Sequence, residues 1–548
     1  MNKLLWILLV FGNVWTFTAQ EEAWFYLRAR DTLINPTFEK IADSLRYTGE
    51  DPALTALFSN RHISIFKKTY RNANKANLKN TFFVVAKEES LMEALLTEAS
   101  HLFVWGEIVS EEDKKIFEPN DYGLTSTIGE NLGAQVNLDY YDYLGVPKAW
   151  YYTTGNEDIV IGISDGTVDL EDIEFKDKTT QFQKSTQSRG HGISVAMSAA
   201  GRGNNAYGIA GICYDCSIFS TSYGQFLTLA QLVELSKAGA KVINCSWGIK
   251  KRSYDKAQQA IYDMLENGTV IVSTGGNPSF LETKGVEYYY PASYDKVIGI
   301  SSGFHRYEDY RDNILQRPHK DGTLFYAQNL RNHVGNNVGF VDGDTTQVPK
   351  RIYKKSIKNL NSEIDILAPG KGVFRYGEYY KKKEIAYSGG QTSSVAPLIT
   401  GTIGLMFSLY PCLPADEVDG ILKITSTNID YVEANAPFAG MYGSGMLHTG
   451  RAVEMVFKLY AEKETAYIEN QNFSRWDFKI SSLSKELHIR NQKFTDSSTL
   501  KVNAKNRIVI GVNTVLRPDA KGSISLKIDP SMEKQCDLIL RDPSILDE

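Results

Sequence analysis

The sequence has no block of like charges and no basic stretch. Its 60 basic and 65 acidic side chains are mixed along 548 residues and leave a net charge of −5. A protein that binds nucleic acid presents a clustered basic face, so this pattern excludes nucleic acid as an expected partner. Neither an internal repeat nor a low-complexity tract is visible. With 42% hydrophobic and 23% charged residues, the composition is typical of a globular protein with a real core, and the length predicts two to four domains.

Cysteine is scarce, and the five cysteines are an odd number. Cys213 and Cys216 form a Cys-x-x-Cys pair, but no second pair and no histidine pair at metal-binding spacing accompanies them. A short disulfide and two free thiols both remain open. Cys245 lies in an apolar run and is expected to be a small core residue. A His-Glu-x-x-His metalloprotease signature is also absent.

Long hydrophobic runs are absent beyond the N-terminus, so we expect no membrane span. At the N-terminus, Lys3 is followed by an apolar run over residues 4–11. This run is too short to cross about 30 Å of hydrocarbon as a helix. It is typical of a signal peptide, residues 1–20, cleaved near Thr18 to Gln20, with a buried N-terminal helix as the alternative. The mature protein is therefore expected to be secreted, into either the extracellular space or the periplasm.

Residues 21–109 are predicted to form a small α+β domain. The expected strands are 23–29, 62–66, 81–86 and 102–109, and the expected helices are 37–46 and 89–100. This βαββαβ order is the split βαβ, or ferredoxin-like, pattern. Residues 110–135 are polar and are predicted to be a linker and processing region.

Strands and helices alternate through residues 136–462. Apolar, β-branched runs predict strands at 159–163, 218–221, 241–245, 269–273, 297–300 and 364–367. Helical spacing predicts helices at 192–200, 227–238, 254–266 and 394–410. Buried strands joined by helices predict an α/β fold with a mainly parallel, doubly wound sheet. Such sheets place their active sites outside the carboxyl ends of the strands.

Two further segments are less regular. Residues 304–360 show no clear periodicity and are predicted to be an insertion that forms an elaborated surface loop. Residues 463–548 contain short alternating runs, such as 487–489 and 507–512, and are predicted to form a small C-terminal β domain.

Four polar side chains stand at the ends of predicted elements. Asp165 and Asn277 each follow a strand, and His191 and Ser393 each stand at the start of a helix. Singly, each residue has a structural explanation, because Ser caps helices and Asp or Asn shapes turns. Together, the order Asp, His, Ser is the order of the subtilisin triad, whereas two unrelated folds use other orders.

The residue types suit acyl transfer through a serine. The Ser393 hydroxyl is a poor nucleophile until an imidazole takes its proton, and His191 would be that base. Asp165 would hold the imidazole in the required tautomer and stabilise its cation. Asn277 and the backbone N–H of Ser393 would donate hydrogen bonds to the oxyanion of the tetrahedral intermediate.

Around these residues, the chain from about 136 to 430 resembles the peptidase domain of the subtilisin-like serine peptidases, the subtilase family. The similar segments are Leu144 to Trp150, Thr153 to Gly155, Asn204 to Gly211, Val242 to Gly248, Tyr290 to Ala292 and Ile364 to Gly370. The choice of Ser393 over Ser394 as the nucleophile depends on Pro397, which follows Ser393 by four residues as in the family pattern.

The chain departs from the family pattern near its expected catalytic residues. Gly166 precedes Thr167 where the family has Ser or Thr before Gly, and Gln391 replaces a glycine. Ile193 and Ser194 stand where the family has Thr and His. Met197 also replaces a glycine. None of these changes removes a residue of the triad.

The resemblance implies a secreted serine endopeptidase that acts on protein or peptide substrates through an acyl-enzyme. It implies that Ser246, Trp247 and Gly248 form an edge for an extended peptide, and that Gly275 and Gly276 form an open wall of the primary pocket. The α+β domain would be an inhibitory propeptide that the enzyme removes from itself. No cofactor is required by this chemistry; calcium sites are common in the family, but the sequence assigns no ligands to one.

Two alternatives come from other functional classes. The altered residues beside His191 and Ser393 are compatible with a catalytically weak binding protein on the same fold. A nucleotide-binding α/β enzyme is disfavoured, because the glycine-rich Gly201-Arg202-Gly203 follows a helix and does not link a strand to a helix. Reaction with a fluorophosphonate probe would separate a peptidase from a binding protein.

Overall fold

The computed structural model describes most of the chain after the N-terminus. The described residues are 22–69, 76–122, 136–186, 189–250, 253–280, 282–283, 285–316, 325–335, 338–340, 344–348, 351–352 and 355–546. The predicted signal peptide and part of the predicted linker lie outside them. The chain divides into two compact units, Met1–Lys114 and Lys115–Glu548, and each unit is described by itself.

The first unit contains a four-stranded sheet in the order β4-β5-β1-β6. Its strands are β1 (Ala23–Ala29), β4 (Ile63–Lys68), β5 (Thr81–Ala86) and β6 (Phe103–Ile108), and its helices are α1 (Pro52–Phe58), α2 (Ala76–Lys79) and α3 (Ser90–Glu98). The central strand β1 is antiparallel to both of its neighbours. Leucine side chains of α1 and α3 pack with phenylalanines of the sheet to form the core. The sheet with its two packed helices has the element order of a split βαβ unit.

The helix predicted at 37–46 is wrong. These residues form an antiparallel hairpin of β2 (Phe38–Ile41) and β3 (Ser44–Tyr47). Phe38 and Tyr47 face each other across the hairpin with ring centroids 5.6 Å apart, and such aromatic pairs stabilise strands. The helix begins later, because the side chain of Asp51 accepts a hydrogen bond from the Leu54 N–H and Pro52 occupies the first helical position.

The second unit is built around a seven-stranded sheet in the order β17-β12-β11-β10-β7-β9-β8. Its strands are β7 (Val160–Ser164), β8 (Thr179–Gln181), β9 (Ser217–Thr221), β10 (Val242–Cys245), β11 (Val270–Thr274), β12 (Val297–Gly303) and β17 (Ile366–Pro369). Every pair of neighbours is parallel. The α/β fold with a parallel, doubly wound sheet is therefore confirmed, and all six predicted strands belong to this one sheet.

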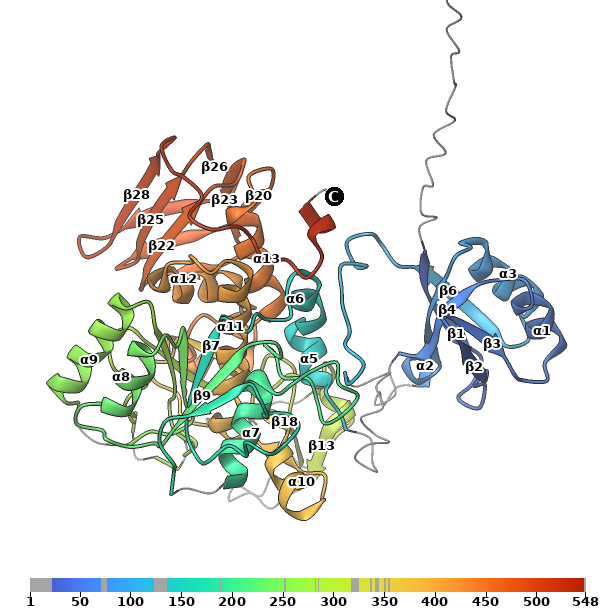
Figure 1. Ribbon diagram of the computed structural model, residues 1–548, viewed down its shortest axis with the longest axis horizontal. Helices are drawn as coiled ribbons and strands as arrows, with labels where there is room; N and C mark the ends of the chain where they lie inside the picture. The colour runs from blue at the N-terminus through green and yellow to red at the C-terminus, as the bar shows by residue number, and fades with distance from the viewer. Residues whose placement is uncertain are drawn as a thin grey trace, which may run out of the picture. The chain divides into compact units, whose positions relative to one another are not determined.

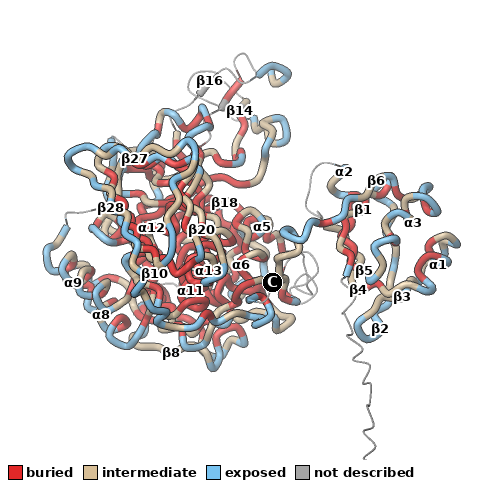
Figure 2. The backbone as a smooth tube through the Cα atoms, turned by 90° about the horizontal axis from the view of Figure 1, so that it is seen from above, coloured by how far each residue is buried: buried red, intermediate tan, exposed pale blue. Residues whose placement is uncertain are grey.

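Helices cover both faces of the sheet. Alternate strand residues such as Ile243 and Ile271 pack with α8 (Ala230–Lys237) and α9 (Asp255–Glu266). The intervening residues, such as Val242 and Val272, pack with the helices of the other face. These helices are α5 (Asp139–Leu144), α6 (Val146–Tyr152), α7 (Arg189–Ala200), α11 (Ala396–Leu409), α12 (Ala415–Thr425) and α13 (Thr449–Tyr460). Figure 2 shows the buried residues concentrated around α11 and α13.

The segment that enters α11 corrects one expectation. Thr392–Leu409 is long and apolar enough to cross a membrane by length and composition, and 89% of it is buried inside the fold. The sequence therefore does contain an apolar segment of membrane-spanning length beyond the N-terminus. Its apolar side chains pack in the core of the second unit, because this helix lies under a sheet that is covered on both faces.

Residues 304–360 contain more regular structure than the surface loop that was predicted. They include η1 (Tyr310–Asn313) and an antiparallel sheet of β13 (Ile314–Gln316), β14 (Phe325–Ala327), β15 (Val338–Gly339) and β16 (Arg351–Ile352). These strands have only two or three residues each. A strand that short has no room for a recognisable alternation of polar and apolar residues.

The C-terminal residues 465–528 form three successive coils of a parallel β-helix (Figure 1). The coils are β20 (Thr465–Glu469), β21 (Asn472–Phe473) and β22 (Asp477–Ser482); β23 (Glu486–Arg490), β24 (Lys493–Asp496) and β25 (Thr499–Ala504); and β26 (Ile508–Ile510), β27 (Val515–Pro518) and β28 (Ser523–Ile528). Each strand pairs in parallel with the strand one coil later. The expectation that the chain has no internal repeat is therefore wrong. The residues that repeat are interior residues that stack from one coil to the next, such as Phe473 and Phe494. Most other positions differ between coils.

The β-helix shares its hydrophobic core with the peptidase-like part of the unit. Its chain then returns to that part, because Cys536 forms a disulfide with Cys412 and the Arg541 N–H donates to the Tyr152 carbonyl over 2.7 Å. Cys213 and Cys216 form a second disulfide, and Cys245 is free and buried. The remaining short elements are β18 (Lys371–Phe374), α10 (Tyr376–Lys382), β19 (Tyr387–Gly389), η3 (Thr392–Ser394), η4 (Glu433–Phe438) and η5 (Pro543–Leu546).

Candidate active site

The candidate residues gather at the carboxyl edge of the parallel sheet. Asp165 directly follows β7, and Asn277 lies three residues after β11. His191 lies in the first turn of α7, and Ser393 lies in η3, which leads into α11. Because α7 packs against both β7 and η3, three segments that are distant in the sequence meet at one place. This is the edge at which parallel sheets bind ligands.

Asp165 and His191 are in direct contact. Nδ1 of His191 lies 2.6 Å from Oδ1 of Asp165, and the same carboxylate oxygen accepts a hydrogen bond from the Gly166 N–H over 2.6 Å. The Asp165 side chain is buried, whereas the His191 side chain is 41% exposed. Burial lowers the pKa of His191, but the hydrogen bond and the charge of Asp165 more than offset this effect, so its pKa lies above the usual value.

Glycines let the two loops approach each other. A Cβ atom on Gly192 would lie 2.0 Å from the carbonyl oxygen of Gly166, a distance that no side chain tolerates. The helix carrying His191 therefore touches the backbone of the turn after Asp165. Gly166, which departs from the family pattern, is one side of this backbone contact.

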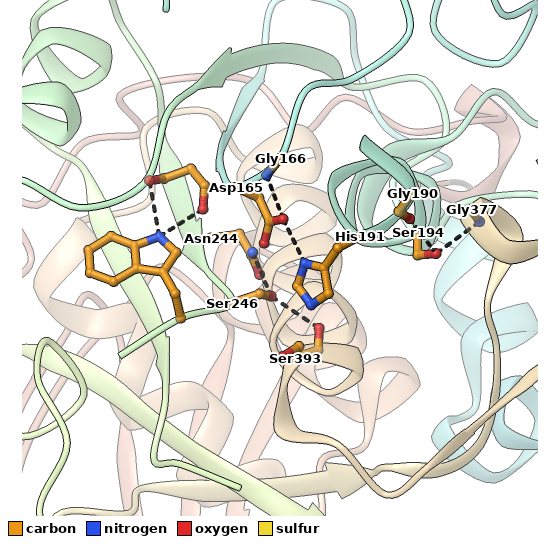
Figure 3. A network of polar contacts seen from close by, with 11 residues as sticks. Asp165, Gly166, Gly190, His191, Ser194, Asn244, Ser246, Gly377 and Ser393 are labelled. Carbon is orange, nitrogen blue, oxygen red and sulfur yellow. Dashed lines mark hydrogen bonds and ion pairs between the residues drawn. The ribbon is translucent and has the colours of Figure 1, made fainter. Parts of the chain in front are cut away.

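Figure 3 shows the His191 imidazole between Asp165 and Ser393, with its second nitrogen, Nε2, on the Ser393 side. The backbone of Ser393 is held by a hydrogen bond from the segment that follows β10. Its carbonyl oxygen accepts a hydrogen bond from the Ser246 hydroxyl over 3.0 Å, and the Asn244 side-chain amide donates to Ser246 Oγ over 2.9 Å. Thr400 of α11 donates in turn to Asn244 Oδ1 over 3.2 Å. The turn with Ser393 is thus bonded to the end of the central strand β10.

The Ser246 side chain therefore supports Ser393, a contact that the sequence did not predict. Asn244 and Thr400 were also missed. The only signal for Asn244 is an amide inside the apolar strand β10, where a polar side chain needs a buried partner.

Asn277 lies beside the nucleophile candidate. Its Oδ1 accepts hydrogen bonds from both the backbone N–H and the hydroxyl of Thr392, over 3.0 and 3.1 Å. Thr392 directly precedes Ser393. The exposed amide of Asn277 is therefore oriented by the same turn that presents the serine.

The other predicted substrate-binding residues follow β10 and β11. The Trp247 indole N–H donates to the Ser164 carbonyl over 2.8 Å, which ties this segment to the end of β7. Cβ atoms on Gly275 and Gly276 would lie 2.4 Å from Ile364 Cδ1 and 2.6 Å from the Tyr289 ring. Neither position has room for a side chain. Gly248 is less crowded, since a Cβ there would lie 3.3 Å from the nearest atom.

A pair of buried carboxylates lies on the loops that follow Asp165 and precede α5. Asp121 and Glu174 are both fully buried. Oδ1 of Asp121 and both carboxylate oxygens of Glu174 have no hydrogen-bond partner, and a Cβ on Gly208 would lie 1.9 Å from Glu174 Oε1. Burial raises the pKa of Glu174 to about 10, with further increases from Asp172 and Asp121 and opposing effects of Lys178 and the Asn205 side chain.

Unpaired, buried carboxylate oxygens are unfavourable unless a proton or a cation satisfies them. Within the described part of the chain, no group of three His, Cys, Asp or Glu side chains is arranged to hold a metal. A site here would therefore combine these two carboxylates with backbone or amide oxygens. Such an all-oxygen set suits a hard cation such as calcium.

Comparison with known proteins identifies the family of the chain. The family model described as Subtilase family matches residues 115–445. A calcium-dependent protease of Trichormus variabilis is 26% identical over 495 residues, which cover 81% of this chain and 68% of that protein. Subtilisin DY of Bacillus licheniformis is 24% identical over 54% of this chain and 88% of its own length. The halolysin-like extracellular serine protease Nep of Natrialba magadii is 27% identical over 51% of this chain and 46% of its own length.

Solved structures resemble the chain at lower similarity. A protease of Pseudoalteromonas arctica has 20% sequence identity and a TM-score of 0.42, with 62% of this chain and 99% of that chain covered. The prenylagaramide maturation protease PagA has 19% identity and a TM-score of 0.40, with 57% of this chain and 98% of that chain covered.

Proposed function

The chain belongs to the subtilase family of serine peptidases, and from this premise we propose that it hydrolyses peptide bonds with Ser393 as nucleophile, His191 as base and Asp165 as the residue that orients the base. The observation that carries the proposal is the 2.6 Å contact between His191 Nδ1 and Asp165 Oδ1. A carboxylate at Nδ1 leaves Nε2 as the nitrogen that accepts a proton. That nitrogen is on the Ser393 side of the ring (Figure 3).

The proposed reaction has two halves. Ser393 Oγ attacks the substrate carbonyl carbon while His191 Nε2 takes the hydroxyl proton. Nδ2 of Asn277 and the backbone N–H of Ser393 stabilise the oxyanion of the tetrahedral intermediate. The intermediate collapses as His191 gives its proton to the leaving amine, and an acyl-enzyme remains on Ser393. Water then repeats the sequence with His191 as base and releases the acid.

Protein or peptide substrates would bind as an extended strand. The segment Ser246 to Gly248 continues β10 beyond the sheet and supplies main-chain hydrogen-bonding groups for such a strand. Gly275 and Gly276, which follow the neighbouring strand β11, pack against the side chains of Ile364 and Tyr289. Main-chain recognition of this kind gives affinity with little sequence selectivity.

We further propose that the protein is secreted, with residues 1–20 as its signal peptide. Relatives are named extracellular serine proteases, in Natrialba magadii and in Serratia marcescens. The disulfides Cys213–Cys216 and Cys412–Cys536 support the proposal, because disulfides persist in oxidising compartments.

We propose calcium as a structural ligand held by Asp121 and Glu174. Two relatives are named calcium-dependent protease, and the unpaired oxygens of these buried carboxylates suit an oxygen-binding cation. The ion would neutralise two buried charges and join the segment before α5 to the loop after Asp165. It would take no part in the reaction itself.

We propose that residues 21–109 are a propeptide and that the mature chain begins before Phe117. The Phe117 N–H donates to the Pro147 carbonyl, and the Arg541 guanidinium lies 4.4 Å from the Phe117 ring centroid. Asp121 and Tyr122 are buried in the second unit. Cleavage after Tyr122 would remove Phe117, Asp121 and Tyr122, whose contacts lie in the second unit. The exposed turn Ser110–Asp113 is more accessible to a protease.

In the proposed domain organisation, residues 136–462 are the peptidase domain and residues 463–548 are its C-terminal β domain.

A fluorophosphonate probe tests the proposed triad, because it reacts with an activated serine. The wild type and Ser394→Ala should both be labelled, and Ser393→Ala should not. Each variant's folding is checked by circular dichroism. A folded wild type that is not labelled would favour the alternative of a catalytically weak binding protein, and loss of labelling in Ser394→Ala alone would move the nucleophile by one residue.

A further inference from the structure

The short helix α10 is fastened to the turn that carries His191. The Gly377 N–H at its start donates to Ser194 Oγ over 2.8 Å, and the Ser194 hydroxyl donates to the Gly190 carbonyl over 3.0 Å. Figure 3 shows this chain of contacts on the far side of α7 from Asp165. A Cβ on Gly377 would lie 1.7 Å from the Gly190 carbonyl oxygen, so the two backbones touch. Ser194, one of the departures from the family pattern, is the residue that makes this attachment.

This attachment brings positive charge close to His191. The segment 371–384 has five basic and two acidic residues. A Cβ on Gly190 would lie 2.6 Å from Cε and 2.8 Å from Nζ of Lys381. The ammonium group of Lys381 therefore lies over the residue that directly precedes His191.

Part of this charge is neutralised within the same segment. Glu378 lies 2.8 Å from an Arg375 guanidinium nitrogen and 3.6 Å from Lys382 Nζ. Lys381 and Lys382 are both exposed. The positive charge of this segment also affects the pKa of His191. Burial has the largest influence on this pKa and lowers it, Asp165 raises it, and the charge of Arg375 lowers it.

The charge of Lys381 would act on the substrate residues that follow the scissile bond. His191 gives its proton to the leaving amine, so the substrate residues that follow the scissile bond must pass beside the first turn of α7. An acidic side chain there would come close to Lys381. The hydrogen bonds described above for Asp165, His191 and Ser393 involve no side chain of α10.

We propose that α10 is a specificity element in which Lys381, assisted by Lys382 and Arg375, selects substrates with carboxylate side chains directly after the scissile bond. The proposal rests on the proposed serine peptidase function and assigns that site a substrate class. The exposed turn proposed for processing has this chemistry, because it contains Glu111, Glu112 and Asp113.

The size of the effect follows from the exposure of the lysines. Single exposed ion pairs change an equilibrium by factors of about two to five. Salt screens such pairs, because the Debye length falls from about 10 Å at 0.1 M to about 3 Å at 1 M ionic strength. The preference should therefore be modest, and it should weaken as salt is added.

Three quenched fluorescent peptides test the proposal. They share the residues before the scissile bond and continue with Glu-Glu, Gln-Gln or Lys-Lys, and mass spectrometry verifies the cleaved bond. kcat/KM is measured for the wild type, for Lys381→Gln and for the control Lys237→Gln. Lys237 is an exposed lysine in the last turn of α8, which leads into the amino end of β10, at the opposite edge of the sheet.

The wild type should cleave the Glu-Glu peptide about two- to fivefold faster than the Gln-Gln peptide, and the Lys-Lys peptide more slowly. Lys381→Gln should bring the ratio of Glu-Glu to Gln-Gln cleavage close to one, with the Gln-Gln rate unchanged. The control should keep the wild-type ratio, and salt of about 1 M should reduce it. A wild-type ratio near one, or an equal loss in both variants, would overturn the proposal.

Failure of the peptidase function itself would look different. In that case the wild type would cleave none of the three peptides. Fluorescence anisotropy then measures the binding of the same peptides to Ser393→Ala, which tests the proposed role of Lys381 without cleavage. A preference for Glu-Glu that disappears in Ser393→Ala/Lys381→Gln supports it, and equal binding of the three peptides overturns it.

Discussion

The backbone N–H and the hydroxyl of Thr392 both donate hydrogen bonds to Oδ1 of Asn277, over 3.0 and 3.1 Å. Because a backbone N–H can only donate, the acceptor end of the Asn277 amide must face Thr392. The donor end, Nδ2, is then directed away from Thr392 and is the end that can serve a substrate oxygen. Thr392 precedes Ser393, so one contact couples the proposed oxyanion donor to the proposed nucleophile.

Replacing Asn277 is expected to lower the rate of the chemical step. Asn277→Ala should reduce kcat by about a hundred- to a thousandfold with little change in KM, which is the loss seen when the equivalent donor of subtilisin is removed. Steady-state kinetics on a peptide substrate measures the split. Thr392→Val is the matched variant: it removes one of the two orienting hydrogen bonds and should cost less. An Asn277→Ala effect confined to KM would mean that Asn277 binds the ground state only.

The pH profile should reflect the influence of Asp165 on His191. His191 accepts a proton only when it is neutral, and its pKa is raised above the usual 6.5. kcat/KM should therefore increase with pH through a midpoint above 6.5, because the imidazole keeps its proton to a higher pH than a free histidine does. Rates between about pH 5 and pH 9 locate this midpoint.

Asp165→Asn provides the control for that profile. It removes the charge that raises the pKa of His191, so the midpoint should move to lower pH. The rate should also fall by about ten-thousandfold, because the imidazole loses its orienting carboxylate. A flat wild-type profile, or a midpoint that the substitution leaves in place, would contradict the assignment of His191 as base.

Calcium should stabilise the wild type through Glu174. A ligand at about 100 times its Kd stabilises the folded state by about 2.7 kcal/mol, so thermal unfolding in calcium should occur at higher temperature than in EDTA. Glu174→Gln should abolish this difference, because the amide matches the protonated carboxyl in shape but supplies no charge to the ion. Glu157→Gln, at an exposed position, should keep it. Equal calcium stabilisation of both variants would contradict the site.

Without calcium, the stability of the wild type should fall as pH rises. The pKa of Glu174 is about 10 in the folded protein, against a usual value of 4.5. Between these values the folded state holds a proton that the unfolded state has released, so the free energy of unfolding decreases with pH. Glu174→Gln should flatten this dependence. Denaturant unfolding in EDTA at several pH values measures both slopes.

Processing should leave residues 117–122 on the mature enzyme. N-terminal sequencing of the secreted wild type should place its first residue between 110 and 117, whereas Ser393→Ala should keep the first unit and begin near residue 20. An active wild type that begins near residue 20 would overturn the propeptide assignment. A mature chain that begins after Tyr122 would instead overturn the role of Asp121 in the calcium site.

Local patterns were sufficient for six of the seven strands of the parallel sheet and for selecting the candidate triad. Every strand predicted within residues 136–462 is in the sheet, because buried parallel strands have continuous apolar runs that are readable one segment at a time. Asp165, His191 and Ser393 could be selected because each stands at an element end. The same local approach failed at residues 37–46. These residues form a hairpin because Phe38 pairs with Tyr47 across the two strands.

The sequence by itself determined which elements form and which residue types stand at their ends, since both depend on neighbours within a few positions. Tertiary structure alone decided how those residues are used: that Ser246 supports Ser393, that Thr392 orients Asn277, that Ser194 fastens α10 beside His191, and that Glu174 is buried without a hydrogen-bond partner. These contacts join residues far apart in the chain. They depend on how packed elements meet in space, and no spacing along the sequence encodes that geometry.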